Sequence, residues 1–132
     1  MKRVVITINR QYGSGGKTIG YMLAEKLGIP CYSREILQRA SEESGINESM
    51  FNQRDERLKR LPKFLLSTNV YSGELLPPES KEFTSDQNLF NYEAEIIKKY
   101  AAEGSCVLIG RCADFVLKDD PDMISVYVHA DH

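Results

Sequence analysis

The sequence predicts an α/β domain in which helices flank a parallel β-sheet. The first observation behind this prediction is the run VVITI at Val4–Ile8, which is apolar and rich in β-branched residues, as in a strand buried on both faces. The second is that such short apolar runs alternate with segments of helical periodicity along the chain. The third is size, because 132 residues with 42% hydrophobic and 27% charged residues suit one globular core. We therefore expect a single domain over residues 1–132.

The first helix is expected directly after a glycine-rich stretch that follows the first strand. It opens at Lys17-Thr18 and places Ile19, Met22, Leu23 and Leu27 on one face. Gly28 and Pro30 then end it, since glycine is a frequent C-cap and proline cannot continue a helix. A strand over 29–32 is predicted next, followed by a helix over 34–44 that Ser33 caps and Gly45 ends. A third helix capped by Asn47 and a helix from Asp86 to a stop at Gly104 come after it. The last predicted elements are a strand over 106–109, a short helix over 113–118 and a strand over 124–128.

The stretch from residue 62 to residue 86 breaks this regularity. Pro62, Pro77 and Pro78 interrupt it, and Ser, Thr, Asn and Gly lie between short apolar pieces. We expect a long, partly mobile connection here, because connections of this length tend to be functional or disordered. The charge-dense segment 53–60 that precedes it is interpreted as a solvated helix face.

The glycine-rich stretch has the context of a phosphate-binding P-loop. Strand, glycine loop, Lys-Thr and helix follow one another, with Gly13, Ser14, Gly15 and Gly16 in the loop. Glycines let successive backbone N–H groups converge on an anion at a helix N-terminus. Lys17 can then reach the outer phosphates of ATP, and the Thr18 hydroxyl can ligate Mg²⁺. The strict P-loop pattern has glycine where this chain has Gln11, so a glycine-rich turn with a surface lysine stays open.

Two further candidate positions follow the ends of other predicted strands. They are Ser33-Arg34 after the second strand and Gly110-Arg111 after the third. Ligands of parallel sheets bind beyond the carboxyl ends of the strands, so these positions and the glycine loop predict a two-part site. The loop would hold a phosphoryl donor, and the arginines would hold a second anionic group. An orientation of Arg34 toward solvent and a structural ion pair for Arg111 remain the alternatives.

The residues Asn9–Gly16 resemble the opening of the cytidylate kinase-like family of P-loop proteins. A second match lies at Leu108–Asp114, and together with the linking segments the resemblance spans nearly the whole chain. It implies a three-layer P-loop NTPase fold, with ATP and Mg²⁺ as cofactors and a small phosphate-bearing acceptor, CMP being one candidate. In cytidylate kinases a Gly-Arg-Asp at the corresponding strand end helps to hold the nucleoside monophosphate, and this implies a substrate-binding and catalytic role for Arg111. Here Cys112 occupies the aspartate position, and Asp114 is the nearest carboxylate.

Composition restricts the classes of partner and compartment. The formal net charge of −2 gives no basic surplus and argues against a general nucleic-acid binder. No apolar run approaches membrane-spanning length, and no secretory cleavage pattern follows the start. Cys31, Cys106 and Cys112 are odd in number without a CxxC pair, which favours reduced thiols in a cytoplasmic protein. A homo-oligomer stays open.

Two functions follow from these patterns. One is an ATP-dependent nucleotide kinase in which Lys17 and Arg111 carry the chemistry and Arg34 and Asp114 contribute to substrate binding. The other is a non-catalytic nucleotide-binding sensor or partner-binding module. Nucleoside monophosphate kinases usually continue into an arginine-bearing lid, and no arginine follows Arg111 here. We therefore expect a fragment or a shortened relative that binds nucleotide but turns over slowly alone.

Overall fold

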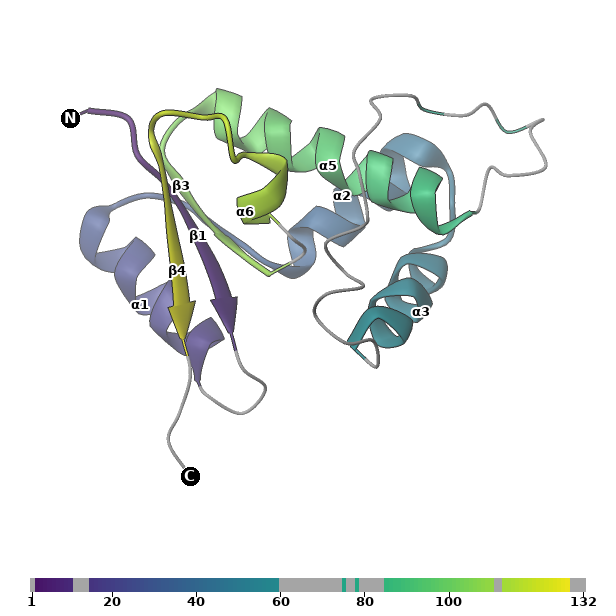
Figure 1. Ribbon diagram of the computed structural model, residues 1–132, viewed down its shortest axis with the longest axis horizontal. Coiled ribbons are helices and arrows are strands. Elements are labelled where there is room, and N and C mark those ends of the chain that lie inside the picture. The colour runs from purple at the N-terminus through teal and green to yellow at the C-terminus, as the bar shows by residue number, and fades with distance from the viewer. Residues whose placement is uncertain are drawn as a thin grey trace. The chain divides into compact units, whose positions relative to one another are not determined.

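The computed structural model describes residues 2–10, 15–59, 75, 78, 85–110 and 113–128 (Figure 1). For Arg10 and residues 55–59 this description covers the backbone alone. The chain divides into two compact units, one formed by Met1–Arg34 with Ile97–His132 and the other by Glu35–Ile96. Each unit is described by itself, and the single domain over 1–132 stays a prediction.

The first unit contains a four-stranded sheet whose order is β2-β3-β1-β4. All three strand pairs are parallel, and in Figure 1 β1 and β4 run side by side in the same direction. The register pairs Ile8 of β1 with Ile109 of β3 and Val126 of β4. This sheet confirms the predicted α/β class. The strands are β1 (Val5–Arg10), β2 (Cys31–Tyr32), β3 (Cys106–Ile109) and β4 (Met123–Val128).

Helices cover the two faces of this sheet because the crossover from β1 to β2 runs in the opposite direction to those from β2 to β3 and from β3 to β4. The connection from β1 to β2 passes β3 and carries α1 (Gly16–Leu27). The connection from β3 to β4 passes β1 the other way and carries α6 (Ala113–Val116). Parallel crossovers are right-handed in nearly all proteins, so opposite directions place the helices on opposite faces. The result is the predicted three-layer arrangement.

Small residues bring α1 onto the sheet. Its buried positions are Gly16, Gly20 and Ala24, which share one helix face at a spacing of four. Ala24 belongs to a core cluster of the first unit with sheet residues, and the predicted apolar residue Leu23 packs partly against it. The other large apolar side chains of α1 lie outward, with Ile19 44% and Met22 56% exposed. The predicted helix is confirmed, but its apolar stripe is not the face that contacts the sheet. The other members of the cluster are Ile6, Ile8, Val107 and Ile109.

The end of α5 (Asp86–Glu103) packs on the opposite face of the sheet. The Tyr100 ring stacks on Tyr32 of β2, with ring centroids 3.7 Å apart and planes 13° from parallel. The Cys106 thiol lies 3.9 Å from the Tyr100 carbonyl oxygen. Tyr32 and Cys106 alternate with Cys31 and Val107, which belong to the α1 side, so these contacts come from the second face.

Arg3 forms hydrogen bonds and ion pairs at the amino end of the sheet. Its guanidinium donates to the Ala101 carbonyl oxygen at 2.8 Å and pairs with Asp120 at 2.7 Å and Asp122 at 2.9 Å. These hydrogen bonds hold the pKa of the Asp120 carboxyl below its usual range, and the N–H of Asp122 contributes to the same shift. One side chain thereby joins the start of β1, the end of α5 and the turn before β4.

The second unit is helical, and its local start and stop signals agree with the sequence. It contains most of α2 (Arg34–Ser44), all of α3 (Glu48–Lys59) and the first part of α5. Gly45 has φ 77°, the left-handed conformation expected of a C-cap glycine. The Asn47 side chain accepts a hydrogen bond from the Ser49 N–H at 2.9 Å, which confirms the predicted N-cap of α3.

A buried ion pair in this unit departs from the predictions. Arg54 on α3 falls in the segment expected to be a solvated face, yet its side chain is 3% exposed and pairs with Glu93 of α5, which is 1% exposed. The charge density of the segment 53–60 predicted exposure of Arg54 to solvent, although Arg54 keeps a helical spacing with the apolar residues Phe51 and Leu58. The predicted long connection over 62–86 lies almost entirely outside the described residues. Among the helices that the structure describes, none is long and apolar enough to cross a membrane.

Candidate functional site

The first turn of α1 carries the described part of the glycine loop. Gly15 precedes the helix with φ 82°, a left-handed conformation that favours glycine, and its carbonyl oxygen accepts the Ile19 N–H at 3.0 Å. Gly16 is buried, whereas Lys17 and Thr18 are exposed at the helix start. The predicted loop residues Gly13 and Ser14 lie outside the described residues.

The loop after β3 leaves the sheet beside β1. The Gly110 N–H donates to the Ile8 carbonyl oxygen at 2.8 Å, so the end of β3 is joined to β1 two residues before β1 ends at Arg10. The chain leaves β1 toward β2 and leaves β3 toward β4, so the loops diverge from neighbouring strands. This divergence is a topological switch point, the place where open parallel sheets form their ligand crevice. Arg111 directly follows Gly110 in sequence and lies outside the described residues.

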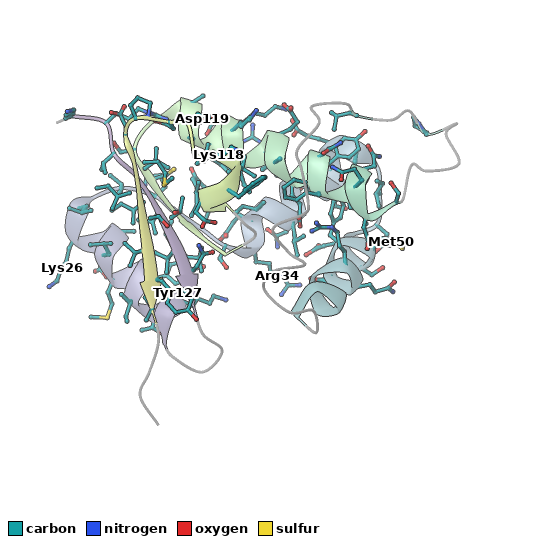
Figure 2. The ribbon with its side chains drawn as sticks, viewed as in Figure 1. Lys26, Arg34, Met50, Lys118, Asp119 and Tyr127 are labelled. Atoms are coloured by element: carbon teal, nitrogen blue, oxygen red, sulfur yellow. The ribbon has the colours of Figure 1, made fainter. Side chains whose placement is uncertain are left out.

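The remaining predicted site residues follow the same edge of the sheet. Arg34 is exposed at the first position of α2, directly after β2 and Ser33 (Figure 2). Because β3 lies between β2 and β1, the end of β2 is about two strand spacings, or ~10 Å, from the end of β1. Asp114 is half-buried in the first turn of α6, which begins three residues after Gly110.

The Asp119-Asp120 pair belongs to the other end of the sheet. Figure 2 shows Asp119 at the turn between α6 and β4, where β4 begins. Asp120 pairs with Arg3 there. The pair therefore serves the turn and is not part of the candidate site.

The described residues suit an anionic ligand at the start of α1. A glycine occupies the N-cap, so no side chain caps this end of the helix, and the first turn contains no acidic residue. A Cβ placed on Gly15 would meet no atom of the described chain within 4 Å, which leaves open space beside the turn. The first turn also carries the Lys17 ammonium and the Thr18 hydroxyl, groups of the kinds that bind phosphate and a phosphate-bound metal ion.

No three His, Cys, Asp or Glu side chains gather into a metal-binding group within the described parts of the chain. Magnesium at nucleotide sites is held by one or two protein groups together with phosphate oxygens. Thr18 with a bound triphosphate is therefore a suitable set of ligands, and the predicted Mg²⁺ would arrive with the nucleotide.

Gly20 is a feature of this site that the sequence patterns did not single out. A Cβ at this position would lie 2.7 Å from Cδ1 of Ile109 and 3.1 Å from Cδ1 of Ile8. The recurrence of small residues at 16, 20 and 24 was the available signal for this close approach.

Comparison with known families identifies the chain. The cytidylate kinase-like family matches residues 5–132. The chain belongs to the cytidylate kinase-like family. This membership confirms the resemblance seen at Asn9–Gly16 and at Leu108–Asp114. No curated protein matches the chain.

A solved structure shares the fold of this cytidylate kinase-like chain. It is the crystal structure of an uncharacterized protein from Eubacterium ventriosum ATCC 27560, with 26% sequence identity and a TM-score of 0.59. The match covers 98% of this chain and 55% of that chain. The chain thus spans about half the length of that relative.

Proposed function

We propose that this chain belongs to an ATP-dependent nucleotide kinase that transfers the γ-phosphoryl group of ATP to a small phosphate-bearing acceptor, with CMP the first candidate. The observation that carries the proposal is the switch point, where the first turn of α1, which no side chain caps, and Gly110 follow the neighbouring strands β1 and β3. Family membership and this geometry support donor and acceptor sites side by side.

Each site residue has a role that follows from its chemistry. The amides of Gly13–Gly16 and the Lys17 ammonium bind and orient the donor phosphates, and Thr18 provides a hydroxyl ligand for the accompanying Mg²⁺. Arg111 binds the acceptor phosphate through its planar fork. Arg34 and Asp114 stand at the same edge and contact the acceptor. ATP supplies the transferred group, so the chain's own contribution is positioning and charge neutralisation.

Cys112 favours a second candidate function. It stands where the resemblance to cytidylate kinases expects an aspartate that helps to hold the acceptor. A nucleotide-binding sensor or partner-binding module would need the glycine loop and Lys17 but no acceptor aspartate. A cytoplasmic location is part of either proposal and is supported by the cysteine usage.

Calorimetric titration of ATP and CMP separately tests the assignment. Lys17→Ala removes a charged hydrogen-bond donor worth about 1.5–3 kcal/mol and should weaken ATP binding roughly ten- to hundredfold. Lys26→Ala is the matched control, because Lys26 is exposed in the last turn of the same helix, far from the glycine loop (Figure 2). Arg111→Lys keeps the charge but loses the fork, so it should weaken CMP binding and spare ATP.

The outcomes separate the two functions. Loss of CMP binding in Arg111→Lys with ATP affinity retained supports the kinase. ATP binding by a wild-type protein that binds no nucleoside monophosphate supports the sensor. Equal ATP affinity in Lys17→Ala and wild type, with the fold intact, removes the donor site.

A further inference from the structure

We infer that Gly20 is a positioning residue that sets the spacing between the first turn of α1 and the carboxyl ends of β1 and β3. The first turn of α1 is the proposed donor side and the Gly110 turn is the start of the proposed acceptor side. The inference about spacing stands on the described residues alone, and its consequence for ligand binding rests on the proposed function.

The contact at Gly20 leaves no room for a side chain. A Cβ there would lie 2.7 Å from Cδ1 and 3.1 Å from Cγ1 of Ile109, and 3.1 Å from Cδ1 of Ile8. Real Cβ atoms are essentially never found closer than 3.0 Å to another heavy atom. Ile8 and Ile109 are both almost fully buried and are register partners on neighbouring strands. Protein interiors are close-packed, so these side chains have little space into which to retreat.

The two residues that Gly20 touches lead directly to the proposed ligand loops. Ile109 is the last residue of β3 and precedes Gly110, and the Ile8 carbonyl oxygen accepts the Gly110 N–H. On the helix side, Gly20 lies on the same face as Gly16, four residues or about 6 Å further along the axis. A change at this contact therefore acts on both sides of the switch point.

The expected effect of an added methyl group is a displacement. Alanine favours a helix over glycine, so Gly20→Ala would stabilise an unhindered helix. Here the methyl group must displace α1 or the Cδ1 end of the Ile109 side chain. Because Ile109 is buried, we expect part of the displacement to fall on α1 and to move the amides of Gly15 and Gly16 relative to Gly110. Misplacement of reacting groups by about 1 Å can cost roughly a hundredfold in rate.

The test compares Gly20→Ala, Ile109→Val and the double variant Gly20→Ala with Ile109→Val. Ile109→Val deletes Cδ1, the atom 2.7 Å from the new methyl group, so it should relieve the contact. The first readout is the amide chemical shifts of Gly15, Gly16 and Gly110 without nucleotide. The second is the dissociation constants of ATP and CMP. We expect Gly20→Ala to shift these amides and to weaken ATP binding at least tenfold, and the double variant to restore both.

The result that overturns the inference is a Gly20→Ala protein with unchanged amide shifts, or a displacement that Ile109→Val does not reverse. If Gly20→Ala fails to fold, a folded double variant with native shifts supports the inference and an unfolded one overturns it. Failure of the proposed function is seen separately, because a wild-type protein that binds neither ATP nor CMP removes that function while the amide shifts still report the spacing.

Discussion

Removal of the Arg54 guanidinium should strongly destabilise the helical unit. Arg54 Nη1 lies 3.4 Å from Glu93 Oε2, its Nε donates to the Asp86 carbonyl oxygen at 3.0 Å, and its guanidinium carbon lies 5.2 Å from the centroid of the Phe90 ring. At an effective dielectric constant of about 20, charges at this separation attract by roughly 5 kcal/mol. Desolvation of both groups offsets most of that attraction, so the net value of the pair is small. Arg54→Met nevertheless takes the guanidinium from a buried carboxylate, and such changes cost about 3–5 kcal/mol.

Urea unfolding at neutral pH measures this loss for Arg54→Met, Glu93→Leu and the double variant. The double variant should recover much of the stability, since apolar replacements of a buried pair are often neutral. Gln53→Met is the control, because it introduces the same side chain at the neighbouring exposed position of α3. A loss below about 1 kcal/mol for Arg54→Met would refute the reasoning, because that is the range of solvent-exposed pairs. A double variant as unstable as the worse single variant would also contradict it.

Two further predictions concern the sheet unit. Arg3→Ala removes hydrogen bonds to Asp120, Asp122 and the Ala101 carbonyl oxygen and should lower the free energy of unfolding by about 1–3 kcal/mol at neutral pH. Because Arg3 lowers the folded-state pKa of Asp120, this stabilisation is complete above the ordinary carboxyl pKa and is lost as pH falls through the folded value. The difference in the free energy of unfolding between wild type and Arg3→Ala should therefore decrease as the pH falls from about 5 to about 2. A difference that stays constant over this range would argue against the Arg3–Asp120 pair. Burial raises the pKa of the Cys106 thiol to about 11, so iodoacetamide at about pH 8 should modify half-buried Cys31 well before Cys106 in the folded protein. Peptide mapping by mass spectrometry measures the order in which the two thiols are modified, and equal labelling of Cys31 and Cys106 would contradict the prediction.

Local signals in the sequence predicted the elements well because their physical causes are local. Gly28 and Gly45 end their helices in left-handed conformations, with φ 68° and 77°. The Ser49 N–H finds the Asn47 side chain two residues away. Each of these features depends on a few neighbouring residues, so a single sequence contains the information.

Packing over long sequence distances could not be predicted in the same way. The apolar residues Ile19 and Met22 predicted that their face of α1 is buried. The helix instead lies close to the sheet through the small residues Gly16 and Gly20, and Ile19 and Met22 are exposed. Likewise, Arg54 looked like part of a solvated charged face because Glu93, which pairs with it, lies 39 residues further along the chain. A pattern of hydrophobicity ranks side chains by polarity and does not measure how near two backbones come.

The strand-end placement of the described candidate residues was predictable, and the site itself remains a prediction. Strand ends with glycine and arginine placed it at the carboxyl edge of the sheet, and the structure brings Gly15–Thr18 and Gly110 to that edge. The roles of Lys17, Arg34 and Asp114 stay predictions. Gly13, Ser14 and Arg111 lie outside the described residues, so their roles stay predictions as well.

The identity of residue 20 shows how the sheet and the site depend on one another. Glycine inside a helix is less favourable than alanine by about 1 kcal/mol, and a helix that merely covered the sheet would gain that stability from a methyl group. A methyl group at residue 20 would lie 2.7 Å from Cδ1 of Ile109 and 3.1 Å from Cδ1 of Ile8, so the side chains or the helix would have to move from their present positions. Strand order alone places the two loops at neighbouring strand ends, whatever the distance of α1 from the sheet. Strand order therefore determines at which strand ends the candidate residues lie. We infer that the missing side chain at Gly20 determines how close the two halves of the proposed site come.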